Sequence, residues 1–263
     1  MIGNQLAIAT NLIFSALLIF LIRYCIRLIG KNERSVTAVF YTFGLISLLL
    51  SYLYWLAYGL IRPDTRMPFA ANEVGENACI LLIASTVQTV FNGKTLDSVR
   101  ETVFAIFLQA ACVGLWIGWS GEWIQDIIAA FVMFYFVYVT IKSLKVSDAL
   151  SKAEWRMLGG SMLLLVLLQG LTFAVPKEIL KPLDTVCYVL IFAICAYYAY
   201  IVIKALKEGH DNEKIMSLSC CGYLYGLNAM YMSAEPMYFA AELFMIIMMV
   251  ILTLSVGRAV MKE

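Results

Sequence analysis

An acidic residue inside an apolar segment is the feature of this sequence best suited to chemistry. Glu242 lies in PMYFAAELFMIIMMV, more than one helical turn beyond the start of a long apolar segment. A carboxylate at such a position should face water or the interior of a helical bundle. It could bind a cation, exchange a proton or pair with a ligand amine. We therefore predict that Glu242 binds a ligand or lies on a transport path, with Arg62 or Arg66 on the correct side to pair with it.

Eight further carboxylates fall on the same predicted side of the membrane. They are Asp64, Glu73, Glu76, Glu122, Asp126, Glu178, Asp184 and Glu235. Glu73 and Glu76 are three residues apart, and Glu122 and Asp126 are four apart, so each pair lies on one face of a helix. They could point into a common vestibule, and we name Glu73, Glu76 and Asp126 as expected ligand-binding residues. The alternative is that they complement helix dipoles and cap free N–H groups.

Aromatic residues gather near these carboxylates. Tyr58, Trp119 and Trp123 are expected at the outer boundary of the membrane, where aromatic side chains form an interfacial belt. Rings beside carboxylates also bind organic cations through cation–π attraction. We therefore add these three residues to the predicted pocket and expect a small cationic or polar ligand.

Several functional classes are excluded by what the sequence lacks. The sole histidine, His210, is expected in a solvated loop between Glu208 and Asp211, which excludes bis-histidine haem ligation. Nucleotide-binding and hydrolase motifs are absent, and no tract of basic residues suits nucleic acid. The seven cysteines are expected to pack within helices. We predict no cofactor, no metal and no nucleic-acid partner, and we expect a role other than catalysis, with a membrane enzyme kept as an alternative below.

The elements that must position these residues are membrane helices. With 62% hydrophobic and 14% charged residues, the chain is more apolar than a soluble domain. A crossing needs roughly 20 apolar residues. Nine segments meet this requirement, at roughly 5–29, 37–61, 74–91, 102–120, 123–144, 157–175, 185–206, 215–234 and 237–260. The third and eighth are the least apolar, and the eighth should be enclosed by its neighbours.

The basic residues predict how these segments are oriented. Of the nineteen lysines and arginines, fifteen fall on one side of the nine segments. The other side holds Arg62, Arg66, Lys177 and Lys181. By the positive-inside rule the N-terminus is outside and the C-terminus is cytoplasmic. We predict an all-α polytopic bundle in the lipid bilayer of a bacterial cytoplasmic membrane. It would be a single transmembrane domain over 1–263, with a leading helix and four hairpins that turn outside.

Other polar and small residues within the segments predict packing. The amides are Gln88, Gln109, Gln169 and Asn228, which are expected to join helices through hydrogen bonds. Two G-x-x-x-G pairs, Gly114 with Gly118 and Gly222 with Gly226, are expected to let helices approach closely. The sequence Ser151-Lys-Ala-Glu154 has the form of a capping box and predicts a helix start.

Residues 52–86, YLYWLAYGLIRPDTRMPFAANEVGENACILLIAST, are similar in layout to multi-span membrane sensor regions of bacterial signalling proteins. These regions have a span that ends in aromatic residues, an outer loop with Pro or Gly, and a Pro-x-small-x-acidic pattern at the start of the next span. In this sequence Pro68, Ala70 and Glu73 take the places of that pattern. Such regions act on a cyclase or kinase domain, which this sequence lacks. The resemblance implies a small-ligand sensor or accessory subunit with a separate membrane or cytoplasmic protein partner. The alternatives are a small-molecule or ion transporter that uses Glu242, and a membrane enzyme or structural subunit.

Replacing Glu242 with Gln removes the charge and keeps the size of the side chain. If the carboxylate binds a ligand or lies on a transport path, Glu242→Gln should fold normally and lose ligand response or uptake. Folding is checked by size-exclusion chromatography and function by ligand binding and proteoliposome uptake. Behaviour like that of the parent would show that the outer carboxylates only cap helices.

Overall fold

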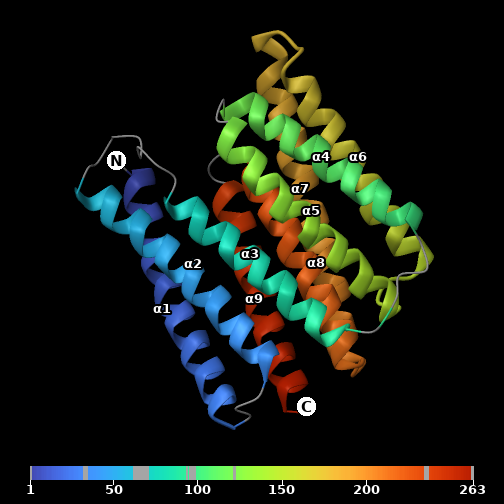
Figure 1. Ribbon diagram of the computed structural model, residues 1–263. Helices are drawn as coiled ribbons and strands as arrows, with labels where there is room; N and C mark the ends of the chain where they lie inside the picture. The colour runs from blue at the N-terminus through green and yellow to red at the C-terminus, as the bar shows by residue number, and fades with distance from the viewer. Residues whose placement is uncertain are drawn as a thin grey trace. The chain divides into compact units, whose positions relative to one another are not determined.

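The computed structural model describes residues 2–31, 35–61, 71–92, 94, 99–120, 123–233 and 237–261. Within these residues the chain forms nine α-helices and no strand, which confirms the predicted all-helical fold (Figure 1). The helices are α1 (Ile2–Lys31), α2 (Val36–Ile61), α3 (Ala71–Val90), α4 (Val99–Ser120), α5 (Trp123–Val146), α6 (Lys152–Thr172), α7 (Lys177–Lys207), α8 (Asn212–Tyr231) and α9 (Met237–Val260).

Seven helices of the described chain are long and apolar enough to cross a membrane. They are α1, α2, α4, α5, α6, α7 and α9. The two that do not meet both conditions, α3 and α8, correspond to the third and eighth predicted segments, which carry charges at the start or polar residues throughout. The fold is therefore a membrane-like helical bundle, whereas nine crossings and their orientation stay predictions.

Helix α7 begins earlier than its sequence predicts. The segment VPKEILKPLD is predicted to form an outer turn, but α7 already starts at Lys177 and contains Pro182. The turn between α6 and α7 is therefore shorter than predicted.

Contacts along the chain define two compact units. The first unit is Met1–Val90 with Val256–Glu263, and the second unit is Phe91–Ser255. The prediction of one domain over 1–263 is not tested by this division and stays a prediction. Each unit is described below by its own helices.

In the first unit, α2 and α3 pack closely against each other. Hydroxyls of Thr37 and Thr89 lie 2.9 Å apart at one end of the pair. At the other end, Ser51 Oγ donates to Glu76 Oε1 at 3.2 Å. Gly75 permits this close packing, because a Cβ there would lie 2.8 Å from the carbonyl oxygen of Ser47 on α2. The two helices are therefore antiparallel neighbours.

In the second unit, polar contacts at both ends hold α4 and α5 antiparallel. The Trp116 indole donates to Asp126 Oδ1 at 2.7 Å, and the Lys145 ammonium donates to Glu101 Oε1 at 2.9 Å. Helices α6 and α7 also pack together. In this part of the chain, α4 therefore packs against α5 and α6 against α7, whereas the four hairpins that turn outside stay a prediction.

Helix α8 is buried, as expected for a membrane helix with polar residues. Fourteen of its twenty residues are buried. Its Gly222 and Gly226 face α9, where an added Cβ would lie 2.7 Å from Met248 Cγ and 2.8 Å from Met245 Cβ, respectively. From α7, Tyr198 Oη donates to the carbonyl of Leu218 at 2.9 Å. The prediction that neighbouring helices enclose this segment is confirmed.

The other G-x-x-x-G pair does not pack as predicted. A Cβ at Gly114 would have no described atom within 4 Å, and a Cβ at Gly118 would meet only the ring of Phe173, at 3.6 Å. Gly114 lies on an exposed face of α4. The prediction of a close helix approach is therefore wrong at Gly114, because the spacing does not determine which face turns inward.

Replacing one glycine of each pair with alanine tests whether the two pairs differ in packing. Gly226→Ala should lower the free energy of unfolding by about 1–3 kcal/mol, because the backbone of Met245 must move. Gly114→Ala should be neutral or stabilising, because alanine favours helix by up to about 1 kcal/mol over glycine. Thermal unfolding in detergent measures both variants. Equal effects would contradict the packing of α8 on α9.

Candidate functional site

A cavity of about 720 Å³ lies among α4, α5, α6 and α8 in the second unit. Ligand pockets commonly have volumes of roughly 300–1,000 Å³. Along α4 its lining extends from Arg100 to Gln109, and the eight helical steps from Glu101 to Gln109 cover about 12 Å at 1.5 Å per step. The cavity is therefore deep enough to hold a small elongated ligand.

Basic side chains line one end of this cavity, which we call the mouth. They are Arg100 at the start of α4, Lys145 at the end of α5, and Lys152 and Arg156 at the start of α6. Glu101 is the carboxylate that lines the same end, and it pairs with Lys145. The Lys145 ammonium also lies 4.9 Å from the ring centroid of Trp155. Since bases outnumber the carboxylate, the mouth favours an anion.

The local sequence between α5 and α6 explains how the mouth is formed. Asp148 adopts a left-handed backbone with φ of 47°, and Ala149 N–H then donates to the carbonyl of Leu144 at 3.0 Å. Such a residue commonly ends a helix. The predicted capping box starts the next one: Ser151 Oγ accepts from Glu154 N–H at 3.3 Å, and Glu154 Oε2 accepts from Ser151 N–H at 2.7 Å. The loop is thus short and well defined.

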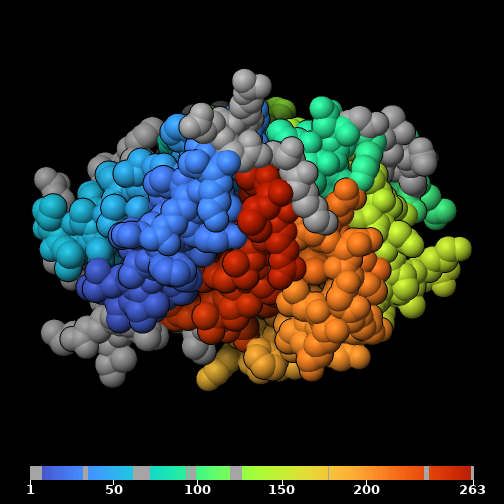
Figure 2. Space-filling model, turned by 90° about the horizontal axis from the view of Figure 1, so that it is seen from below, coloured from blue at the N-terminus to red at the C-terminus, as the bar shows by residue number. Residues whose placement is uncertain are grey.

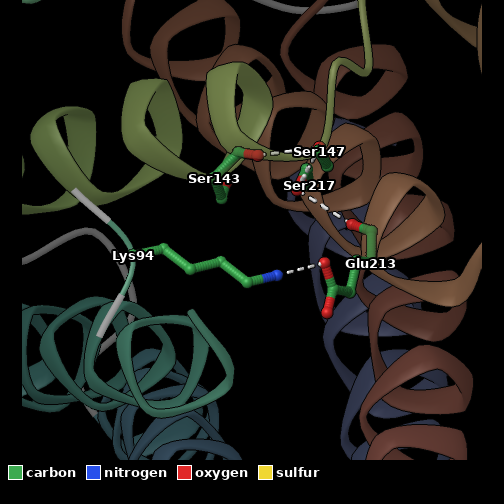
Figure 3. Close-up of polar contacts among 5 residues, drawn as sticks. All are labelled: Lys94, Ser143, Ser147, Glu213 and Ser217. Carbon is green, nitrogen blue, oxygen red and sulfur yellow. Dashed lines mark hydrogen bonds and ion pairs between the residues drawn. The ribbon is translucent and has the colours of Figure 1, made fainter. Parts of the chain in front are cut away.

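A chain of polar contacts ties the end of α5 to the start of α8 (Figure 3). Ser147 Oγ lies 3.1 Å from Ser217 Oγ, which donates to the carbonyl of Glu213 at 2.9 Å. The carboxylate of Glu213 pairs with Lys94 at 2.7 Å. In the space-filling view, the end of α5 (yellow-green) lies beside the start of α8 (orange) (Figure 2). These contacts hold the α5 side of the mouth in place.

An amide pair lies at the opposite end of the cavity. Gln109 Nε2 donates to Asn228 Oδ1 at 3.0 Å, and Asn228 Nδ2 donates to Gln109 Oε1 at 3.1 Å. On α6, Gln169 donates to the carbonyl of Met232 at 3.1 Å. The prediction that membrane amides join helices is confirmed for these residues. The lining extends no further than Gln109 along α4 and Val137 along α5.

Two buried polar atoms in the lining have no hydrogen-bond partner among the described residues. They are Glu101 Oε2, near the mouth, and Tyr225 Oη, one turn before Asn228 on α8. The Tyr225 side chain is only 8% exposed. Ser161, whose hydroxyl donates to the carbonyl of Leu158 at 3.0 Å, lies near Tyr225 Oη, but the two hydroxyls do not form a hydrogen bond of regular geometry. Buried polar groups are usually satisfied, so two such atoms in the lining of one cavity are an unusual feature.

The sides of the cavity are apolar. Phe104 and Leu108 line it from α4, and Ile141 and Leu144 line it from α5. The site therefore combines a basic mouth, apolar sides and polar atoms along its depth. Such a cavity is suited to an amphipathic molecule.

Two of the residues predicted from the sequence, Glu242 and Asp126, belong to the second unit but do not line the cavity. Glu242 is only 2% exposed, which confirms that this carboxyl faces inward, while its function stays a prediction. Asp126 is buried and accepts the indole hydrogen bond of Trp116, so the structure gives it a role in the α4–α5 hairpin. The side chains of Trp119 and Trp123 lie outside the described part of the structure.

The other three predicted residues belong to the first unit. Glu76 accepts from Ser51, and Tyr58 stacks on Tyr54 with ring centroids 6.3 Å apart. Glu73 lies in the first turn of α3. A vestibule shared by the two units stays a prediction. The residues of related predictions that lie outside the described part of the chain are Arg62, Asp64, Arg66, Pro68, Ala70, Glu122 and Glu235.

The sequence did not predict the cavity. The lysines and arginines that line the mouth predicted only the orientation of the chain in the membrane. A signal was present on α4, where the lining residues Glu101, Ala105 and Leu108 recur at helical spacing. Lys152 and Arg156 are four residues apart and so share a face of α6. That these two faces meet around a space could not be read from either segment alone.

The amide pair provides a test of the structure at the inner end of the cavity. Asn228→Leu leaves Gln109 without its partner and should lower the free energy of unfolding by about 1–2 kcal/mol. The double variant Gln109→Leu with Asn228→Leu should lose less than the sum of the two single changes. Thermal unfolding of all four proteins measures this coupling. Additive losses would contradict the direct pairing.

Comparison with known protein families, curated proteins and solved structures finds no match to this chain. Function must therefore be argued from the chemistry of the described residues. The observations available for this are the cavity, its charge and its unsatisfied polar atoms.

Proposed function

We propose that this protein is a membrane receptor or accessory subunit that binds a small ligand in the cavity among α4, α5, α6 and α8. The observation that carries the proposal is a cavity of ligand size whose lining contains the unsatisfied Glu101 Oε2 and Tyr225 Oη. A bound molecule with hydrogen-bonding groups would satisfy both atoms. A buried polar group without a hydrogen bond costs free energy, and a ligand that bonds to it removes that cost.

The shape of the cavity favours binding over passage. Its lining stops at Val137 and at Gln109, whose amide is occupied by Asn228. A transporter requires a polar route through both halves of the membrane. A cavity closed by an amide pair is better suited to hold a ligand than to conduct it.

The positive-inside rule predicts that the mouth faces the cytoplasm of a bacterium. We therefore propose that the ligand enters from the cytoplasm or the inner leaflet. The mouth is bordered by the α5–α6 connection, which could transmit occupancy to a separate protein partner. The outer acidic and aromatic pocket predicted from the sequence is a distinct proposal, and the cavity does not depend on it.

Filling the cavity tests the proposal. Ala105 lines the cavity, whereas Ala110 lies on an exposed part of the same helix. Ala105→Trp should displace a ligand that co-purifies with the parent, and Ala110→Trp should retain it. Native mass spectrometry of the protein released from mild detergent measures bound molecules. Both variants should unfold at similar temperatures if only occupancy differs.

If Ala105→Trp and Ala110→Trp retain the ligand equally, the cavity is not its binding site. Proteoliposomes loaded with the co-purified compound distinguish a receptor from a transporter. A receptor should bind the compound without moving it across the membrane. Protein-dependent flux would overturn the receptor proposal.

The second candidate is a small-molecule or ion transporter that uses Glu242. The observation in its favour is the burial of this carboxyl, 2% exposed, on an apolar helix beside the polar helix α8. In this case the Glu242→Gln protein should lose flux in the same proteoliposomes. Retained flux in that variant would remove Glu242 from the pathway.

A further inference from the structure

We propose that the ligand of this cavity is an amphipathic anion, with a negatively charged head group at the basic mouth and an alkyl chain between the apolar sides. This inference rests on the proposed function, because it names the ligand class of the same site. It concerns the end of the second unit where α5 ends and α4 and α6 begin.

The charge of the mouth selects the head group. Arg100, Lys152 and Arg156 line the mouth, are exposed and form no ion pair with a carboxylate of the described residues. Helices α4 and α6 both begin there, so the positive ends of their dipoles add to the attraction. Arginine side chains bind carboxylates and phosphates through paired N–H groups. A neutral or cationic head group would lack these interactions.

The sides of the cavity select the tail. Phe104, Leu108, Ile141 and Leu144 present hydrocarbon over the length of about 12 Å between Glu101 and Gln109. Ala105 and Gly159 are small and leave the space between these side chains open. A bare anion such as inorganic phosphate would leave these surfaces uncovered. An alkyl chain would remove them from water or replace a disordered lipid chain.

The two unsatisfied polar atoms fit a ligand of this class. Glu101 Oε2 can accept from a hydroxyl or ammonium group beside the anionic head. Tyr225 Oη, deeper in the cavity, can donate to an ester or carbonyl oxygen of the chain. Phospholipids of the inner leaflet and soluble long-chain acids share this chemistry. The experiment must therefore separate these two sources.

Binding of four probes to the full-length protein in phosphatidylcholine nanodiscs tests the ligand class. The probes are dodecanoate, dodecanol, dodecyltrimethylammonium and inorganic phosphate. Dodecanoate should bind about tenfold or more tightly than dodecanol, as expected for hydrogen bonds to a charged group. Inorganic phosphate and the cationic probe should bind more weakly still. Equal binding of dodecanoate and dodecanol would overturn the proposal.

Nanodiscs that contain phosphatidylglycerol identify the source of the ligand. If a bilayer lipid is the ligand, phosphatidylglycerol should stay bound in native mass spectra and should compete with dodecanoate. If a soluble acid is the ligand, dodecanoate should bind with unchanged affinity in these nanodiscs. Either result supports an amphipathic anion as the ligand if Arg156→Gln and Lys152→Gln also weaken dodecanoate binding.

Two charge-removing variants locate the head group. Arg156→Gln and Lys152→Gln should each weaken dodecanoate binding by about tenfold and leave dodecanol unaffected. Lys207→Gln is the matched control, because Lys207 is exposed at the end of α7 and does not line the cavity. An equal loss in Lys207→Gln would show a nonspecific charge effect and overturn the proposal.

The Ala105→Trp variant separates failure of this inference from failure of the proposed function. If it abolishes binding of dodecanoate and dodecanol alike while both bind the parent equally, the cavity binds ligands but the anionic class is wrong. If every probe binds the Ala105→Trp variant as tightly as it binds the parent, the cavity is not the binding site and both proposals fail. Thermal unfolding confirms that each variant is folded before binding is compared.

Discussion

The burial of α8 is the constraint on which the second unit depends. In hydrocarbon no water is present to satisfy polar groups, so a helix rich in Ser, Asn and Gly must be enclosed by protein. Ser219 bonds the carbonyl of Ile215 at 2.7 Å, and Asn228 bonds Gln109 on α4. On its other sides α8 packs against α5, α7 and, through Gly222 and Gly226, α9. The surrounding helices therefore shield the polar residues of α8, and α4 supplies a hydrogen-bond partner to one of them.

The cavity is a consequence of how this enclosure is completed. Helices α4 and α6 pack side by side, with Phe104 only 3.4 Å from the position of a Cβ at Gly159 (Figure 1). The small residues Ala105, Gly159 and Gly160 do not fill the space that α4, α5 and α6 leave beside α8. Native interiors are closely packed, so a space of this size with unsatisfied polar atoms is the feature on which the proposal of a ligand site rests.

The bases around the mouth serve two physical purposes. As members of a positive set at one end of the helices, they are expected to orient the chain in the membrane. In the folded protein, Lys145 pairs with Glu101 and lies over the ring of Trp155, while Lys152 lies within the capping box that begins α6, directly after its N-cap Ser151. A residue that anchors a helix at the interface can therefore also supply the charge of a binding site. Such overlap explains why charge counting alone did not reveal the cavity.

The sequence by itself determined the properties that depend on neighbouring residues: the all-helical class, the capping box at Ser151, and the enclosure of the polar segment around Asn228. Hydropathy and helix capping are local, so they can be read along the chain. Only the tertiary structure decided that Gln109 pairs with Asn228, that Gly114 faces outward whereas Gly226 packs on α9, and that Arg100 and Arg156 border one cavity. These features depend on the rotation of each helix about its axis and on which distant helix it meets, and a single segment contains neither quantity.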